Sequence, residues 1–544
     1  MIDLKSTISI DFGTTNSSVY IYRNNHSEAV PNTERQGVNQ FPSFVEYSGS
    51  NIITGYTAWE NFGKKNKFVV AAVKRLIGQP YEEYEKLDDK SIFGCEVIKG
   101  DDGYPRFVVD KNRRTVSAIE VATELFKRIK SAADAYGGKQ YTKAYVTAPA
   151  NYKDNQCRAI KEAAKLAGLE VLKLITEPTA AAMSWCFDNI DKINPGEKMV
   201  VYDFGGGTFD VSLVSANATN GYTIINTDGN PHLGGNDIDS CIVEYLLKKI
   251  TATTHSSDIE DSIRSSKRKM NRLRHDCEQC KIILTGRCSY DDDVERFYEK
   301  NKNNYYDFDL SDYCDDGLNI TFTAKDLNEA IKDRIEESVK VTKRMLELSK
   351  LNIGNIRFCF LVGGSSYLHL IKQKIRSVFK KMEFPVINPD LAVALGAMRL
   401  LMNDENHVVT IEEKIVISYC IQANETQAVI ILQKGEAIPI ASGDFTFTNP
   451  HGNENKFECN IYQWAGEPSD IKAVNDKYLL VPIKDCTHIL TFQFENQFPQ
   501  PSREQRILVS FKLDVGGTLN VNCRDKQHNK LLSSTGFDAV YGGH

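Results

Sequence analysis

The chain has 544 residues, 41% of them hydrophobic and 25% charged, with a net charge of −6. This length predicts roughly three or four domains or subdomains, and the negative charge argues against a nucleic-acid coat and against binding to an anionic membrane. No signal-like segment or apolar run long enough for a membrane span occurs, and the thirteen cysteines lack framework spacing, so we expect a cytoplasmic protein with reduced thiols.

The first element is an apolar run at 8–10 that leads into DFGTTNSS at 11–18. The pattern predicts a strand, a glycine turn and a hydroxyl-rich return strand. Gly13 lacks a Cβ, so backbone N–H groups can approach an anion, and the hydroxyls of Thr14 and Thr15 can donate to phosphate oxygens. Because Asp11 would repel phosphate directly, we expect Mg²⁺ between the two.

The same pattern, an apolar run that leads into Asp and a glycine turn, occurs again as DFGGGTFD at 203–210, after the apolar run at 199–202. Between the two copies, strand-like runs alternate with amphipathic helices such as 117–135 and 155–167, which is typical of an α/β fold. A repeated turn of this kind predicts a duplicated domain in which one hairpin from each half faces a common nucleotide cleft.

A basic stretch at 264–281 is compatible with a nucleic-acid patch or with a helix that carries cations on one side. The helical spacing of Met270, Leu273 and Cys277 favours the helix. Cys277 and Cys280 form a CxxC, but a second pair at zinc-site spacing is missing, so we do not expect a metal there.

Residues 403–414 become charged around a short apolar core, which predicts an interdomain linker. After it the pattern changes to short strand candidates divided by turns, which predicts a β-sandwich over 415–526 followed by a short tail at 527–544. The eight strand candidates are 415–421, 428–432, 445–448, 456–464, 478–483, 488–494, 506–513 and 518–523.

These motifs together resemble the seventy-kilodalton heat-shock chaperone family (heat shock protein 70 kDa), in the family's order, from residue 1 to about 526. The resemblance implies an α/β actin-like ATPase domain of two lobes over 1–402, a linker at 403–414 and an all-β sandwich that binds extended peptide, without a helical lid. The matching segments are DFGTTNSS, VKRLIG (73–78), TAPANYKDNQ (147–156), TEPTAAA (176–182), DFGGGTFDVS (203–212), HLGGNDID (232–239), LRHDCEQCK (273–281), LVGGSS (361–366) and NPDLAVALGA (388–397).

The resemblance also implies roles for individual residues. Lys74 resembles the family's catalytic lysine at the attacking water, and Glu177 resembles the carboxylate that completes the water and cation site; Asp203 and Thr208 complete this catalytic set. The metal ligands for Mg²⁺ and K⁺ are Asp11, Asp203 and Asp210. The residues matched to ATP or ADP binding are Gly13, Thr14, Thr15, Asn16, Gly205, Gly206, Gly207, Gly234, Gly235, Glu278, Lys281, Thr285, Gly363, Gly364, Ser365, Tyr367 and Asp390.

Two positions depart from the family where its paired arginines sandwich the adenine. Ile282 and Tyr367 stand there instead. Tyr367 can stack on a base and Ile282 can contact it, but the cation–π contribution of arginine is gone. We therefore expect looser adenine selectivity.

The leading hypothesis is an ATP-dependent chaperone that hydrolyses Mg·ATP slowly and binds unfolded polypeptide, as in protein folding and the stress response. It implies a J-domain co-chaperone and a nucleotide-exchange factor as partners, and neither nucleic acid nor membrane. The alternative is a nucleotide-binding adaptor of the ribosome-associated type, favoured by the altered linker and by Cys157 where the family has arginine. The intact set around Lys74 and Glu177 favours the ATPase, and the β-sandwich disfavours a small-molecule kinase.

Overall fold

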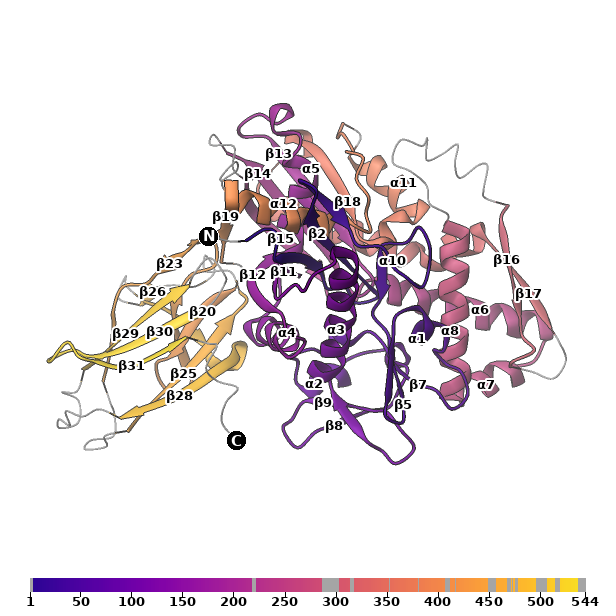
Figure 1. Ribbon diagram of the computed structural model, residues 1–544, viewed down its shortest axis with the longest axis horizontal. Helices are drawn as coiled ribbons and strands as arrows, with labels where there is room; N and C mark the ends of the chain where they lie inside the picture. Colours follow the sequence, from indigo (N-terminus) through magenta and orange to yellow (C-terminus); the bar gives the residue numbers. More distant parts are fainter. Residues whose placement is uncertain are drawn as a thin grey trace. The chain divides into compact units, whose positions relative to one another are not determined.

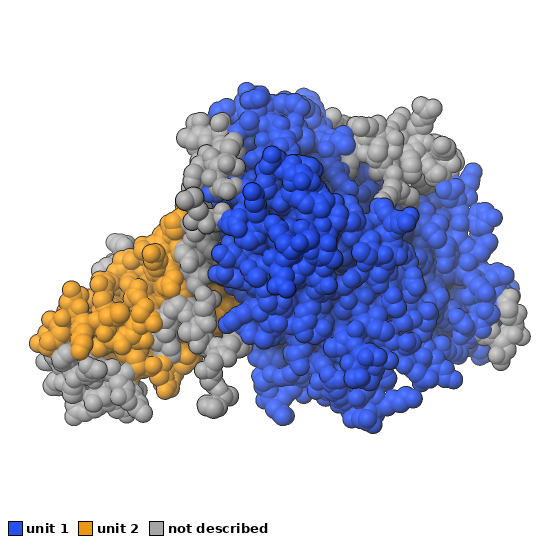
Figure 2. All heavy atoms as spheres, in the orientation of Figure 1, with its two compact units in different colours: residues 1–150, 159–410 blue, residues 151–158, 411–544 orange. Residues whose placement is uncertain are grey.

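The computed structural model describes most of the chain in two compact units (Figures 1 and 2). Unit 1 comprises residues 1–150 and 159–410, and unit 2 comprises residues 151–158 and 411–544. No helix in the described ranges is long and apolar enough to cross a membrane. The described residues are 3–217, 222–285, 303–313, 318–351, 353–379, 381–406, 411–415, 417–448, 456–466, 471, 473–474, 478–495, 506–513 and 519–536.

The first sheet of unit 1 carries the first glycine turn. Its strand order is β12-β11-β1-β2-β3, and β4 also pairs with β2. β11 runs parallel to β1, whereas β2 returns antiparallel to it, so the turn after Asp11 lies at the carboxyl end of β1. The strands are β1 (Thr7–Asp11), β2 (Asn16–Arg23), β3 (His26–Ala29), β4 (Gln40–Pro42), β11 (Lys143–Ala148) and β12 (Glu170–Thr176).

The second sheet of unit 1 repeats this arrangement around the second glycine turn. β18 runs parallel to β13, and β14 returns antiparallel to it with Asp203 opposite Asp210. The duplicated domain predicted from the repeated turn is confirmed, and it agrees with the two-lobed actin-like fold that the resemblance implies. The strands, in sheet order, are β18 (Ile356–Val362), β13 (Lys198–Phe204), β14 (Phe209–Ala216) and β15 (Tyr222–Asn230).

The helices of unit 1 form where caps and apolar periodicity agree. Ser117 and Glu120 make a reciprocal capping box at the start of α3, which fixes the predicted helix 117–135. α5 and α12 pack so closely that a Cβ on Gly396 would collide with the carbonyl of Ala180. The long helices are α3 (Ala118–Gly137), α4 (Asp154–Leu166), α5 (Glu177–Cys186), α6 (Gly235–Thr254), α8 (Lys267–Thr285), α10 (Ala324–Leu348), α11 (His369–Val378) and α12 (Ala392–Asn406).

Small elements complete unit 1. Three of them carry residues used below: α1 (Tyr56–Glu60), η1 (Val73–Arg75) and η5 (Gly364–Tyr367). The others are β5 (Val45–Ser48), β6 (Asn51–Thr54), β7 (Phe68–Val70), α2 (Tyr81–Glu85), η2 (Ser91–Phe93), β8 (Val97–Lys99), β9 (Pro105–Val108), β10 (Thr115–Ser117), η3 (Ile190–Lys192), α7 (Asp258–Arg264), β16 (Tyr305–Asp309), β17 (Asn319–Thr323) and η4 (Ile353–Asn355).

Unit 2 contains the predicted β-sandwich. One sheet has the order β26-β27-β21-β20-β25-β28, and the other has β23-β29-β30-β31 with β24 also paired to β29. Inward side chains of both sheets, such as Ile461 and Val521, form its core. The strands of these two sheets are β20 (Ser418–Gln422), β21 (Gln427–Leu432), β23 (Ile440–Ala441), β24 (Phe445–Thr448), β25 (Lys456–Trp464), β26 (Ala473–Val474), β27 (Tyr478–Pro482), β28 (Thr487–Glu495), β29 (Arg506–Leu513), β30 (Leu519–Asp525) and β31 (Leu531–Gly536). Unit 2 also contains η7 (Ile483–Asp485) and the strands β19 (Ile411–Lys414) and β22 (Ala437–Ile438), which pair with each other.

Each of the eight predicted strand segments contains a strand, but the sandwich does not end at residue 526. Leu531–Gly536 form β31, which pairs antiparallel with β30, so the expectation of a tail is wrong for these residues. The strand was missed because residues 533–536 are polar or glycine and show no strand pattern. Hydrogen bonds to β30 keep these residues extended. Val408 and Val409 of the predicted linker and residues 537–544 lie outside the described residues. The remaining domain boundaries stay predictions.

Candidate functional site

The two glycine turns of unit 1 meet face to face. A Cβ on Gly206 would collide with the Thr15 hydroxyl, and a Cβ on Gly207 would lie 2.6 Å from the Thr14 Oγ1 atom. A Cβ on Gly13 would strike the carbonyl of Asn16 within the first turn. Gly206 and Gly207 of the second turn therefore lie directly against the Thr15 and Thr14 side chains of the first, and glycine leaves the space that these side chains occupy.

Two further glycine segments dock on the second turn. The backbone N–H of Gly235 donates to the Gly205 carbonyl (2.9 Å), and that of Asn236 donates to the Gly206 carbonyl (2.8 Å). The Ser365 hydroxyl donates to the Gly205 carbonyl as well (3.0 Å). Gly363 has a φ of 80°, which a residue with a Cβ rarely adopts. These contacts join the start of α6 and η5 to the turn.

Lys74 and Glu177 form a buried ion pair beside the turns. The Lys74 Nζ atom donates to Glu177 Oε1 at 2.6 Å, and the two residues are only 5% and 7% exposed. Lys74 lies on η1, whose preceding residue Ala72 has a left-handed φ of 53°. A non-glycine residue in that region stores strain, which often accompanies a functional segment. The next residue, Arg75, pairs with Asp237 of α6 at 2.5 Å and holds η1 in place.

Three carboxyl groups lie near this pair: Asp203 and Asp210 are buried, and Asp11 is partly exposed. Burial and repulsion from Glu177 raise the pKa of Asp11 to about 7 and the pKa of Asp203 well above its usual value. The same two causes raise the pKa of Asp210 to about 7. Burial alone would lower the pKa of Lys74, but attraction to Glu177 and Asp11 raises it. One lysine does not balance this charge, so the group is suited to a cation.

A cation here would need ligands beyond the protein. In the part of the chain that the structure describes, no cluster of three or more histidine, cysteine or acidic side chains is arranged to hold a metal ion. Mg²⁺ commonly keeps several waters and binds through one or two carboxylates together with phosphate oxygens. The carboxyl groups beside a glycine cradle for phosphate fit that mode.

The turns, the ion pair and the acidic cluster open into one cavity of ≈ 360 Å³. The predicted site residues line it except two: Gly234 lies behind Gly207, and Asp210 lies opposite Asp203 in the β13–β14 ladder. The lining residues predicted from the sequence are Asp11, Gly13, Thr14, Thr15, Asn16, Lys74, Glu177, Asp203, Gly205, Gly206, Gly207, Thr208, Gly235, Glu278, Lys281, Thr285, Gly363, Gly364, Ser365, Tyr367 and Asp390.

The sequence reasoning missed a group at the rim of this cavity. Arg35, Tyr56, Trp59 and Gln279 also line it. The Trp59 indole donates to Glu278 Oε2 at 2.9 Å, and the Arg35 guanidinium lies 4.1 Å from the Tyr56 ring centroid. No motif marks Arg35, Tyr56 or Trp59, and Gln279 lies within the matched segment 273–281 but was not given a role. The signal that could have found them is the aromatic pair of α1, because aromatic rings at a cleft often contact a ligand.

The far end of the cavity differs from the phosphate end. Ile282 is 53% exposed on α8, and Tyr367 lines the same space from η5. The Lys372 Nζ atom lies 5.7 Å from the Tyr367 ring centroid. The amide nitrogen of Gln279 is buried and has no hydrogen-bond partner among the described residues. This end offers apolar and aromatic contact and one amide donor.

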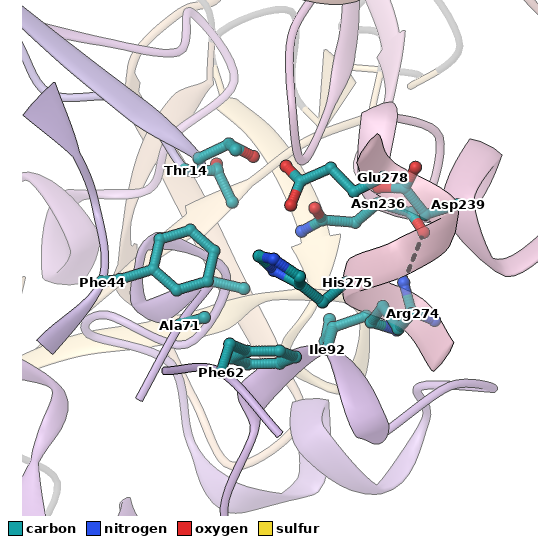
Figure 3. Close-up of a pocket in the computed structure, with 12 residues that line it drawn as sticks. Thr14, Phe44, Phe62, Ala71, Ile92, Asn236, Asp239, Arg274, His275 and Glu278 are labelled. Carbon is teal, nitrogen blue, oxygen red and sulfur yellow. Dashed lines mark hydrogen bonds between the residues drawn. The ribbon is translucent and has the colours of Figure 1, made fainter. Parts of the chain in front are cut away.

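A second chamber, of only ≈ 20 Å³, adjoins the cavity through Thr14 and Glu278 (Figure 3). The His275 ring projects into it from α8, and burial, together with the charge of Arg272, lowers the pKa of His275 to about 4. His275 is therefore neutral near neutral pH and packs against Trp59, with ring centroids 4.8 Å apart. Arg274 donates to the Asn236 carbonyl at 2.9 Å. The chamber is therefore a small, closely lined space beside the first turn.

Comparison with known proteins agrees with this geometry. A family model described as Hsp70 protein matches residues 7–535. The chain is 29% identical over 534 residues to a chaperone protein DnaK from Burkholderia cepacia, an alignment that covers 96% of this chain and 76% of that protein. The resemblance inferred from the motifs is confirmed. Since the family match extends through both units and includes every segment of the cavity, the chain belongs to the Hsp70 family.

Proposed function

We propose that this protein is an ATP-dependent molecular chaperone of the cytoplasm. It binds Mg·ATP in the cavity of unit 1, hydrolyses it slowly and binds unfolded or extended polypeptide through the β-sandwich of unit 2. The observation that carries the proposal is the buried Lys74–Glu177 ion pair beside two facing glycine turns. A cavity that only stored a nucleotide would not need a buried lysine–glutamate ion pair at that point, because burying an ion pair is costly.

In this proposal the residues around the phosphates have separate tasks. Phosphoryl transfer to water needs little covalent chemistry, so positioning and charge stabilisation supply most of the catalysis. Lys74 places and polarises the attacking water, and Glu177 orients Lys74. Thr14 and Thr208 donate to phosphate oxygens. Asp11, Asp203 and Asp210 would hold Mg²⁺, which would neutralise the charge of the phosphates when bound. K⁺ is a second proposed cation.

The sandwich completes the proposed cycle. An extended peptide can add hydrogen bonds along a strand edge and place alternate side chains in apolar pockets. We include a J-domain protein and a nucleotide-exchange factor among the partners, because the DnaK relative is named a chaperone protein. Ile282 and Cys157 are positions at which this chain departs from the family. The coupling between nucleotide binding and peptide binding in this chain is to be measured by experiment.

Single-turnover ATP hydrolysis, measured with and without a J-domain protein, tests the proposal. We expect slow basal hydrolysis that the J-domain protein accelerates, and loss of both rates in Lys74→Ala. Lys86→Ala is the matched control, since Lys86 is an exposed lysine that pairs only with Glu83 at the surface. Tight ATP binding without measurable hydrolysis in the parent protein would contradict the ATPase and support the adaptor.

A further inference from the structure

Two buried serines lie behind the first glycine turn. Ser17 belongs to β2 and Ser43 follows β4, and each is only 2% exposed. Thr14, Thr15 and Asn16 of the turn line the nucleotide cavity, whereas the two serines are not among the residues that line it. The turn therefore lies between the cavity on one side and two hydroxyl groups on the other.

The two hydroxyl groups and the backbone of Gly13 form a closed ring of three hydrogen bonds. The Ser43 hydroxyl donates to the Gly13 carbonyl at 2.8 Å. Its single proton is used in this bond, so Ser17 is the donor in the 3.1 Å contact between the two hydroxyl oxygens. The Gly13 N–H completes the ring by donating to the Ser17 Oγ atom at 3.2 Å. The ring thus holds the peptide groups on both sides of Gly13.

Ser43 also holds the other end of the turn. Its backbone N–H donates to the Thr15 carbonyl at 2.8 Å. Because this bond flanks the pair Asn16–Pro42 of the β2–β4 ladder, that pair is a non-hydrogen-bonded one. One buried residue therefore binds the carbonyl groups of both Gly13 and Thr15, through its side chain and its backbone respectively.

The direction of these two carbonyl groups determines the direction of the next N–H groups. In a planar trans peptide the C=O and N–H bonds point opposite ways. Since the Gly13 and Thr15 carbonyls point toward Ser43, the N–H groups of Thr14 and Asn16 point away from it, to the side where both residues line the cavity. Neither N–H group has an acceptor in the part of the chain that the structure describes. Two backbone donors directed to one side of a turn form a site for an anion.

We propose that Ser43 is a positioning residue for phosphate binding, an inference that rests on the proposed binding of ATP in this cavity. Ser43 keeps the carbonyls of Gly13 and Thr15 away from the cavity and so presents the N–H groups of Thr14 and Asn16 to the phosphate chain. Without its hydroxyl the Gly13 carbonyl loses its donor, and the Gly13–Thr14 peptide is free to rotate. A rotated peptide would turn a partly negative oxygen toward the phosphates.

Calorimetric binding of ATP, ADP and adenosine to Ser43→Ala tests the proposal. We expect the affinities for ATP and ADP to fall about tenfold and that for adenosine to stay within about twofold, because adenosine has no phosphate. Ser9→Ala is the matched control: the Ser9 hydroxyl of β1 is 0% exposed and donates to the Ala394 carbonyl at 2.8 Å, but it does not contact the turn. This variant loses the same kind of bond and should keep all three affinities. Ser43→Thr retains the hydroxyl and should recover most of the ATP affinity.

The outcomes separate this inference from the proposed function. An unchanged ATP affinity in Ser43→Ala, or an equal loss for adenosine and ATP, would overturn the role of Ser43 while ATP binding by the parent stands. A parent chain that binds no ATP would overturn the proposed function and this inference together. Should Ser43→Ala fail to fold, NMR of the unmodified chain decides. The amide protons of Thr14 and Asn16 should shift downfield when Mg·ADP binds, and unchanged positions would overturn the proposal.

Discussion

The two ends of the nucleotide cavity differ in packing, burial and charge. At the phosphate end, glycine turns from both sheets touch, and Lys74 and Glu177 are buried with Asp203 and Asp210 beside the partly exposed Asp11. At the other end, Ile282 is half exposed and Tyr367 offers one ring face. The phosphate end is crowded at Gly13, Gly206 and Gly207, where a Cβ would collide, while Ile282 at the base end is exposed. We infer that phosphates and cation supply most of the specificity.

The largest effect should follow from removing the positive charge of Lys74 at the phosphate end of the cavity. Lys74→Ala should lower the single-turnover hydrolysis rate by at least about a hundredfold, about 3 kcal/mol of barrier, while ATP binding changes little. The reason is that Lys74 acts at the attacking water rather than at the base. Quenched-flow hydrolysis and calorimetric ATP binding measure the two quantities. A mutant within about threefold of Lys86→Ala would remove Lys74 from the catalytic set.

Next in size should be the effect of crowding the turns. Gly206→Ala places a Cβ against the Thr15 hydroxyl, whereas in Gly205→Ala the nearest atom is the Thr208 carbonyl oxygen at an ordinary 3.4 Å. We expect Gly206→Ala to weaken ATP binding about tenfold or more, because the two turns must separate, and Gly205→Ala to weaken it far less. Calorimetry on both variants checks this. Equal affinities would mean that the turns are not held in contact.

A pH series tests the acidic cluster. Asp11 and Asp210, with pKa values raised to about 7 by burial and by Glu177, hold protons below that pH, and a cation must displace them. We therefore expect Mg·ATP affinity to fall about tenfold between about pH 8 and about pH 6. A flat profile would exclude coupling between the cation and these carboxyl groups.

The same carboxyl groups determine whether the free energy of unfolding rises or falls with pH in the nucleotide-free protein. Their folded pKa values lie above the unfolded value, so the folded state binds more protons between about pH 4 and about pH 7. Their contribution to the free energy of unfolding is thus present at the acidic side of this window and lost as the pH rises through about 7. In thermal melts, Asp210→Asn should reduce that loss.

The smallest effect should appear at the base end. ATP and GTP should differ in dissociation constant by less than about a hundredfold, because Ile282 supplies only apolar contact and Tyr367 only stacking. Ile282→Arg should widen the difference by a few-fold through a restored cation–π contact, about 1 kcal/mol. A discrimination above roughly a thousandfold, about 4 kcal/mol, would show that another group such as Gln279 reads the base.

The parts of the site that could be predicted from the sequence share a local cause. A strand that ends in Asp and a glycine turn is specified within eight residues, as in 11–18 and 203–210, and the strands of the sandwich follow from alternation over five to nine residues. The rim residue Trp59 carries no such pattern. It meets Glu278 because α1 and α8 are brought together across more than two hundred positions.

The sequence by itself determined the duplicated α/β domain, the sandwich and most of the residues that line the cavity, because glycine turns with hydroxyl and carboxylate side chains occur in short motifs. Only the tertiary structure decided which of these groups meet. Burial at one point raises the pKa of three carboxyl groups, and the approach of two distant turns leaves no space for a Cβ on Gly206 or Gly207 beside Thr15 and Thr14. These properties depend on distances between segments far apart in the chain, which no local pattern encodes.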